Sequence, residues 1–304
     1  MYGPLPPGAT VFSNGDGDCC MCRLLAYVAA DERSAQEAIG EATLSSFQLL
    51  SCIHGDGWGA AWTSPGEPGG LAAHRSTTAA ADDPAFAALG QGVSARAAFF
   101  HLRWATTGLA VNPANTHPFM ADGWAFAHNG FVHGSERIAD LLPARHRSAL
   151  HGTTDSERYF RLVLHCAEQA GDVLAGVQAA ARMIADIAGP VSINAMLLSP
   201  TRLLAVHGLT GARPPVDDLL ALVRHPDHLP QDHLDGYFHL AYRIAGGTLA
   251  IASSGFPRDG WTPLLPDSIM DVDVNTRRWA QHPLLGEPGA RTGEPIRMTT
   301  AEPA

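Results

Sequence analysis

Cys22 is the residue whose type and place most directly suggest chemistry. It follows Met21 and opens an apolar segment, CRLLAYVA. If translation begins at Met21 and the initiator is removed, Cys22 becomes the first residue and carries a free α-amino group. That amine, with a pKa of about 7.7–8.0, would lie beside the thiol. One residue would then supply both a nucleophile and its base. The alternative is a small buried residue on an edge strand.

Arg103 stands in the segment HLRWATTG, at the end of an apolar strand predicted over 95–105. A polar side chain at that position can face a pocket, and the guanidinium fork binds both oxygens of a carboxylate. The alternative is an arginine in a surface salt bridge. Trp104 and Thr106 belong to the same segment, and we group them with Arg103 as candidate substrate-binding residues.

Two further segments carry polar groups that suit acyl chemistry. AHNG ends a predicted strand in Asn129-Gly130, and a side-chain amide beside a backbone N–H can form an oxyanion hole. The alternative is an ordinary hairpin turn. GTTDSE begins a predicted helix, with Thr154 or Asp155 near its N-cap. The Asp155 carboxylate would suit a substrate ammonium, or it would simply cap the helix.

A histidine-rich segment, HPDHLPQDHLDGYFH, raises the question of a metal site. Its candidate ligands are His225, His228, His233, His239, Asp227, Asp232 and Asp235. Their spacing matches no compact tetrahedral motif, and the two prolines indicate an irregular loop. We interpret the segment as a solvated loop and expect neither a metal nor any other cofactor. We also set aside a metal on the Cys19-Cys20-x-Cys22 run.

The elements that would position these residues do not alternate strictly between strand and helix along the chain. Strands are predicted at 22–29, 95–105 and 124–130, and the glycine-rich segment 54–62 runs into another. Hairpins are predicted at 193–199 with 202–207 and at 239–244 with 248–253. Helices are predicted at 34–50, where Ser34 and Glu37 make a capping box, and at 134–142, 155–169 and 172–188. This order of strands, helices and more strands favours an α+β fold with antiparallel sheets.

Composition limits the function further. A net charge of -10 disfavours nucleic-acid binding, and no apolar run is long enough to cross a membrane. The five cysteines do not form a spaced, even disulfide pattern, so we expect a reducing, cytoplasmic location. We expect residues 1–21 to be a disordered leader or the product of a misassigned start, 22–275 to be one domain, and 276–304 to be a flexible tail.

Taken in order, the motifs resemble those of a known family. MCRLLAY, HGDGWGAAW, HLRWATTG, NTHPF, HNGFV and TTDSE are similar to class II glutamine amidotransferases, which are N-terminal-nucleophile (Ntn) hydrolases. The likeness is dense over 22–160 and looser to about 275. Among the relatives, stand-alone YafJ-type proteins and the γ-glutamyl hydrolase of ergothioneine biosynthesis are nearest in length.

The resemblance implies a four-layer αββα sandwich and a set of roles. Cys22 would attack the side-chain amide of glutamine, giving a thioester and ammonia, and its α-amine would relay the proton. Arg103, helped by Thr106, would hold the substrate α-carboxylate, and Asp155 the α-ammonium. Asn129 and the Gly130 N–H would stabilise the oxyanion. No metal or cofactor is implied.

Two departures and several alternatives stay open. Thr107 replaces a histidine found in glucosamine-6-phosphate synthase relatives, and a 21-residue extension precedes Cys22. With the extension attached, the nitrogen of Cys22 is an amide and no base. The ammonia would pass to a separate ammonia-using synthetase subunit, or the enzyme would simply hydrolyse a γ-glutamyl compound, as in an ergothioneine-like pathway. A non-catalytic glutamine-binding regulatory subunit is the alternative from another functional class.

Overall fold

The structure is a computed structural model. It describes residues 22–105, 108–188, 192–208, 214–221, 223, 229–230, 232–234 and 236–285, and the backbone of 291–292. The expectations for residues 1–21 and for Thr106 and Thr107 therefore lie outside the described residues.

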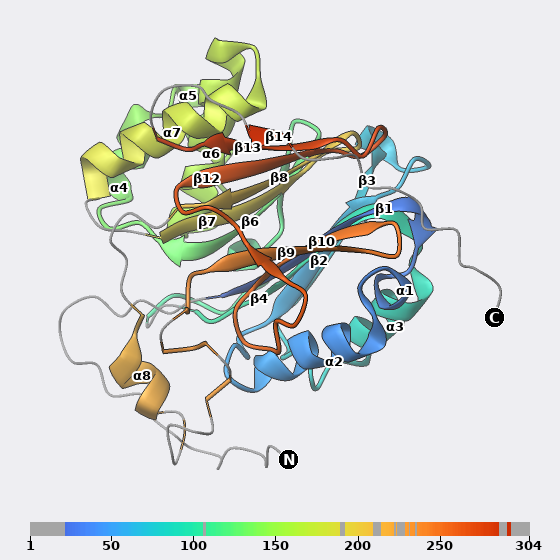
Figure 1. The fold of residues 1–304 in the computed structure, drawn as a ribbon. Helices are drawn as coiled ribbons and strands as arrows, with labels where there is room; N and C mark the ends of the chain where they lie inside the picture. Colours follow the sequence, from blue (N-terminus) through green and yellow to red (C-terminus); the bar gives the residue numbers. More distant parts are fainter. Residues whose placement is uncertain are drawn as a thin grey trace, which may run out of the picture.

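Two antiparallel sheets form the middle of the molecule (Figure 1). The first sheet has the order β11-β9-β10-β1-β4-β2-β3, and the second β14-β13-β12-β8-β7-β6-β5. The first contains β1 (Arg23–Arg33), β2 (Trp58–Thr63), β3 (Leu71–Ser76), β4 (Ala95–Leu102), β9 (Leu240–Ala245), β10 (Thr248–Ser253) and β11 (Thr262–Pro263). The second contains β5 (Phe119–Ala121), β6 (Trp124–Phe131), β7 (Ser192–Leu198), β8 (Arg202–His207), β12 (Ser268–Asp273), β13 (Trp279–Pro283) and β14 (Arg291–Thr292).

Helices cover the outer face of each sheet (Figure 1). The first sheet carries α1 (Ala35–Ile39), α2 (Glu41–Leu49) and α3 (Pro84–Gly92). The second carries α4 (Glu136–Leu141), α5 (Ala144–Arg147), α6 (Asp155–Ala170) and α7 (Val173–Ala188). Short 3₁₀ turns lie at Leu50–Cys52, Pro68–Gly70 and Pro113–Asn115, and α8 (Val216–Ala221) lies to one side. The expected α+β, four-layer αββα sandwich is confirmed.

The apolar pattern of β1 explains why the molecule has layers. Leu24, Ala26 and Val28 belong to the core between the two sheets. Leu25 and Tyr27 point the other way, into the core beneath α1–α3. Side chains alternate across a strand, so a strand buried on both faces has an uninterrupted apolar sequence. A third core lies between the second sheet and α6 and α7.

Several local predictions are confirmed. Ser34 accepts from the Glu37 N–H, and the Glu37 carboxylate accepts from the Ser34 N–H, which completes the capping box. The hairpins β7–β8 and β9–β10 both form. The single helix expected over 34–50 is instead two helices, because Gly40 has a φ of 90° and separates α1 from α2.

Two expectations are wrong. Asn129 and Gly130 do not form a turn: both lie within β6, opposite Asn194 and Ile193 of β7. The domain boundary at 275 is also too early, because Trp279–Pro283 forms β13 and pairs with β12. Among the described residues, no helix combines the length and the apolar composition needed to cross a bilayer.

Candidate active site

Strand pairing brings Cys22 to the end of β4. Cys22 immediately precedes β1, and Arg23 of β1 pairs with Leu102, the last residue of β4. The chain that continues from β4 therefore passes the thiol, and Cys22 Sγ donates to the Trp104 carbonyl at 3.9 Å. The cysteine side chain is 7% exposed and Trp104 is 8% exposed. Two of the expected site residues thus lie in contact.

Burial dominates the acidity of the thiol. It raises the pKa of Cys22 to about 11, against the lowering effects of the Trp104 carbonyl contact and of the positive charges of Arg103 and Arg23. The Asp155 carboxylate adds a smaller raising effect on the same pKa. All three charged groups therefore lie within electrostatic reach of the sulfur. With this pKa only about one thiol in a thousand is ionised at pH 8, so attack requires a base.

Arg103 carries a buried guanidinium. It is 3% exposed, and its two Nη atoms donate to the carbonyls of Asp56 and Ala110 at 3.4 and 3.3 Å. Within the described part of the chain it forms no ion pair. The Asp56 carboxylate accepts instead from the Ala105 N–H at 2.7 Å. Asp56, from the HGDGWG segment, is a residue whose part in holding 103–105 the sequence analysis missed.

Asn129 and Gly130 stand side by side in β6. The Asn129 side chain is fully buried, and neither its Oδ1 nor its Nδ2 has a hydrogen-bond partner among the described residues. A Cβ at position 130 would lie 1.7 Å from the Ser192 carbonyl oxygen, so only glycine fits there. A buried amide with free donors is costly unless something else uses it.

Asp155 begins α6 and is 8% exposed. Its Oδ2 accepts from the Val132 N–H at 2.7 Å, and its Oδ1 from the Ser156 N–H at 2.8 Å. The cap itself is Thr154, whose hydroxyl accepts from the Glu157 N–H. No described residue forms an ion pair with Asp155. The carboxylate is therefore held in place, while its charge has no counter-ion in the part of the chain that the structure describes.

A buried group of contacting side chains begins at Arg23, next to Cys22, and the sequence analysis did not predict it. The buried Arg23 guanidinium lies 3.8 Å from the centre of the Tyr237 ring, and its Nε donates to His54 Nε2 at 3.1 Å. His54 Nε2 in turn lies 3.3 Å from His233 Nε2. His233 is 1% exposed, so the expectation of a solvated loop is wrong for this residue. Asp232 and His239 are exposed, as expected of a solvated loop, and the remaining members, His225, His228, Asp227 and Asp235, lie outside the described residues.

Three buried histidines lie beside the Asn129 strand. Burial lowers the pKa of His101 to about 3, and it also lowers the pKa values of His117 and His128. His128 Nε2 lies 3.2 Å from the Ser192 carbonyl, and His128 Nδ1 lies 3.0 Å from Ser156 Oγ. A carbonyl can only accept, so Nε2 carries the proton and Nδ1 accepts from the serine. The lowered pKa values favour neutral rings. His101 and His128 hydrogen-bond within the framework, whereas neither ring nitrogen of His117 has a partner among the described residues.

One group of metal-ligand types lies elsewhere among the described residues. Donor atoms of His146, His165 and Glu168 lie within 4.8 Å of one another. The Glu168 carboxylate is already in contact with the Arg145 guanidinium. That positive charge opposes a bound cation, and we assign no metal to the group.

Comparison with known proteins agrees with this geometry. The family model described as "Glutamine amidotransferases class-II" matches residues 16–237, well over half of the chain. Glutamine–fructose-6-phosphate aminotransferase (isomerizing) of Idiomarina loihiensis is 35% identical over 108 residues, which are 35% of this chain and 17% of that protein. The Xylella fastidiosa protein of the same name is 33% identical over 103 residues, which are 34% and 17% of the two chains. This chain thus matches under one fifth of the length of these relatives.

Solved structures share the fold. A glutamine aminotransferase class-II domain protein from Silicibacter pomeroyi gives a TM-score of 0.54 at 20% identity, over 90% of this chain and all of that one. The structure of the allosteric regulatory enzyme of purine biosynthesis also gives 0.54, at 15% identity, over 91% of this chain and 50% of that one. The family chemistry is hydrolysis or transfer of the glutamine amide. The match over residues 16–237 therefore shows that the chain belongs to the class-II glutamine amidotransferases, an enzyme family of the Ntn type.

Proposed function

We propose that the protein hydrolyses the side-chain amide of glutamine through a thioester on Cys22. One observation carries this proposal. The Arg103 guanidinium and the Asp155 carboxylate both act on the pKa of the buried Cys22 thiol, and neither has an ion-pair partner among the described residues. The buried Asn129 amide has no hydrogen-bond partner there either, and we assign it to the same site. Buried charges are costly unless paired. The α-carboxylate and α-ammonium of an amino acid would pair both at once.

The substrate ends would be held as follows. Arg103 binds the α-carboxylate through its fork, and Trp104 and Thr106 keep the substrate-binding roles that the family motif implies. Asp155 binds the α-ammonium through the carboxylate edges that its two backbone contacts leave open. Holding both ends fixes the γ-amide carbon relative to Cys22, and such positioning lowers the entropic part of the barrier.

The reaction then needs a proton acceptor and an oxyanion site. The α-amine of Cys22 takes the thiol proton as sulfur bonds to the amide carbon. Asn129 Nδ2 and the Gly130 N–H donate to the resulting oxyanion. The amine returns the proton to the leaving nitrogen, and ammonia departs. Water then attacks the thioester, the sulfur leaves with a proton, and glutamate is released.

This mechanism requires Cys22 to be the first residue of the active protein. An amide nitrogen at that position is not basic, and the thiol pKa of about 11 leaves few thiolates without help. We therefore propose that residues 1–21 are absent from the working enzyme. Two further expectations belong to this proposal. The cysteine pattern favours a cytoplasmic location, and a separate synthetase subunit would use the ammonia that the reaction releases.

Mass spectrometry and turnover together test the proposal. The natively expressed protein should begin at Cys22 and should release glutamate and ammonia from glutamine. Labelling by the glutamine analogue diazo-norleucine should add one adduct at Cys22. Cys22→Ala should lose both turnover and labelling while keeping its melting temperature. An active protein that retains residues 1–21, or Cys22→Ala with undiminished turnover, would contradict it.

A further inference from the structure

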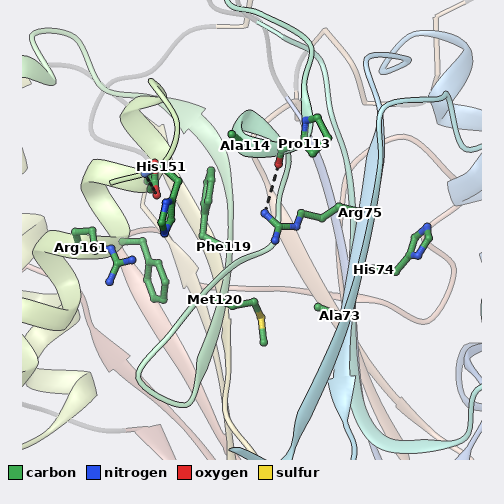
Figure 2. Close-up of a pocket in the computed structure, with 11 residues that line it drawn as sticks. Ala73, His74, Arg75, Pro113, Ala114, Phe119, Met120, His151 and Arg161 are labelled. Carbon is green, nitrogen blue, oxygen red and sulfur yellow. Dashed lines mark hydrogen bonds between the residues drawn. The ribbon is translucent and has the colours of Figure 1, made fainter. Parts of the chain in front are cut away.

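A cavity of about 590 Å³ lies among residues that the proposed reaction does not use. None of Cys22, Arg103, Asn129 and Asp155 lines it. Its walls come from β3, the Pro113 turn, β5 and the first turns of α6 (Figure 2). The volume falls within the range of roughly 300–1,000 Å³ that small-molecule sites occupy.

Arg161 gives this cavity a buried positive charge. The side chain is 9% exposed, and its Nη2 donates to the Ala149 carbonyl at 2.9 Å. Its Nε has no hydrogen-bond partner among the described residues, and no described carboxylate forms an ion pair with it. A buried guanidinium with an unused donor and no counter-charge favours an anion beside it.

Arg75 adds a second guanidinium from the opposite wall. Figure 2 shows it reaching from β3 toward the cavity, with Arg161 and His151 on the far side. Arg75 is exposed, and its Nη1 makes only a long contact of 3.4 Å with the Pro113 carbonyl. It can therefore turn toward a ligand at little cost. Guanidinium forks match the oxygens of carboxylates and phosphates.

The acidic residue of the cavity does not cancel these charges. Glu157 accepts from the N–H groups of His151 and Gly152 at 2.9 and 2.7 Å. Its two oxygens are thus used to hold the backbone before α6, and it forms no ion pair with Arg75 or Arg161. Two guanidiniums face one carboxylate, which leaves the cavity with an excess of positive charge.

Besides His74 and His151, the rest of the lining is apolar. Phe160 and Phe119 are 1% and 5% exposed, and Met120 is 38% exposed beside them. In Figure 2 Phe119 stands between Arg75 and Arg161. Aromatic and thioether groups next to guanidiniums suit a ligand with a flat apolar body and a charged end.

From these observations we propose that the cavity between β3, β5 and α6 binds a small aromatic anion, whose negative charge is stabilised by the Arg161 and Arg75 guanidiniums on the two sides of Phe119. The charged group is a carboxylate or a phosphate monoester, and the ring lies against Phe119, Phe160 and Met120. This site is separate from the glutamine site and does not depend on the reaction proposed above.

Isothermal titration of the full chain with phenyl phosphate and with benzoate tests the site. At least one of them should bind with a Kd below about 1 mM, and the tighter one identifies the charged group. Neutral benzyl alcohol, which has the same ring, should bind at least 10-fold more weakly. Absence of binding by both anions at 10 mM, or equal binding of the alcohol, overturns the proposal.

Four variants locate the binding. Arg161→Gln and Arg75→Gln should each raise the Kd at least 10-fold, and Ala73→Trp should fill the cavity from its exposed wall and abolish binding. Arg96→Gln removes an exposed arginine outside the cavity and should leave the Kd unchanged. If Arg161→Gln fails to fold, Arg75→Gln and Ala73→Trp decide. Binding that survives all the cavity variants, or that is lost in Arg103→Gln, contradicts the assignment.

Discussion

Asn129 and Asn194 lie directly opposite each other in β6 and β7, both fully buried, and they differ in how their amides are used. Asn194 Nδ2 donates to the Phe238 carbonyl at 2.6 Å, and its Oδ1 accepts from the Gly208 N–H at 2.9 Å. The Asn129 amide has no partner among the described residues. Asn194 thus uses its side-chain amide to join parts of the fold. The Asn129 amide, in a similarly buried place, has no such contact among the described residues.

The first prediction compares these two residues. Asn129→Ala should change the free energy of unfolding by less than about 1 kcal/mol, because the small cavity offsets the relief of an unsatisfied buried amide. Its kcat for glutamine should fall about 10²–10³-fold. Asn194→Ala should lower the free energy of unfolding by about 2–4 kcal/mol, since it leaves two buried partners unpaired. Urea melts and initial rates measure both. Equal destabilisation by the two variants would contradict the assignment.

The second prediction concerns the close approach at Gly130. A Cβ there would lie 1.7 Å from the Ser192 oxygen and 2.6 Å from His128 Nε2, so Gly130→Ala must push β6 away from β7. We expect a loss of more than about 3 kcal/mol of unfolding free energy. Gly92→Ala, at the end of α3 with nothing within 4 Å of its Cβ, is the control and should cost nothing. A wild-type melting temperature for Gly130→Ala would refute the geometry.

The third prediction is that acid destabilises the fold through buried histidines. Burial lowers the pKa of His101 to about 3 and that of His207 to about 4. The unfolded value is about 6.5, so below pH 6.5 the unfolded chain binds more protons and stability falls as the pH falls. The free energy of unfolding that these two rings remove grows until about pH 3–4. At pH 5 it amounts to about 2 kcal/mol per histidine.

Urea denaturation between pH 5 and 8 measures this dependence. The free energy of unfolding should be flat above pH 7 and should decrease below it. The slope of the unfolding free energy against pH measures how many more protons the unfolded chain binds. His207→Gln should reduce that number by about one between pH 5 and 6.5. His133→Gln, which alters an exposed ring, should leave the slope unchanged. A stability that does not vary between pH 5 and 7 is incompatible with neutral buried rings.

The fourth prediction concerns the charge beside the nucleophile. The Arg23 guanidinium lowers the pKa of Cys22 against the larger effect of burial. Arg23→Gln should raise that pKa further and slow alkylation of Cys22 by iodoacetamide at pH 8.5 by about 2–10-fold. Arg23→Lys keeps the charge and should recover most of the rate. Peptide mapping by mass spectrometry follows the adduct at Cys22. Equal rates in the Gln and Lys variants would exclude an electrostatic contribution.

The layers of the fold were predictable because they follow from local patterns. β1 contains an uninterrupted apolar run, and the hairpins β7–β8 and β9–β10 join strands that follow each other in the sequence. Such signals come from neighbouring residues. β13 was missed because polar Gln281 and His282 interrupt its apolar pattern, and only pairing with β12 makes it a strand. Long-range pairing of that kind leaves no periodic signal.

The candidate site was predictable only in part, for a related reason. Arg103 follows β4, Asp155 begins α6 and Asn129 lies near the end of β6, and these positions pointed to a pocket. The contacts among Arg23, His54 and His233 join segments far apart in the sequence. Sequence spacing carries no information about such contacts. The Asn-Gly pair misled because a turn signal at the end of a strand is common, and here tertiary pairing overrides it.

The place of β1 in its sheet sets an order for events during synthesis. Its neighbours are β4, made soon afterwards, and β10, which emerges only when most of the chain has been translated. Until then one edge of the strand that follows Cys22 is open to pairing with other chains. At usual translation rates that interval is tens of seconds. A ribosome that stalls before Thr248 therefore leaves a chain in which one edge of β1 has no partner strand.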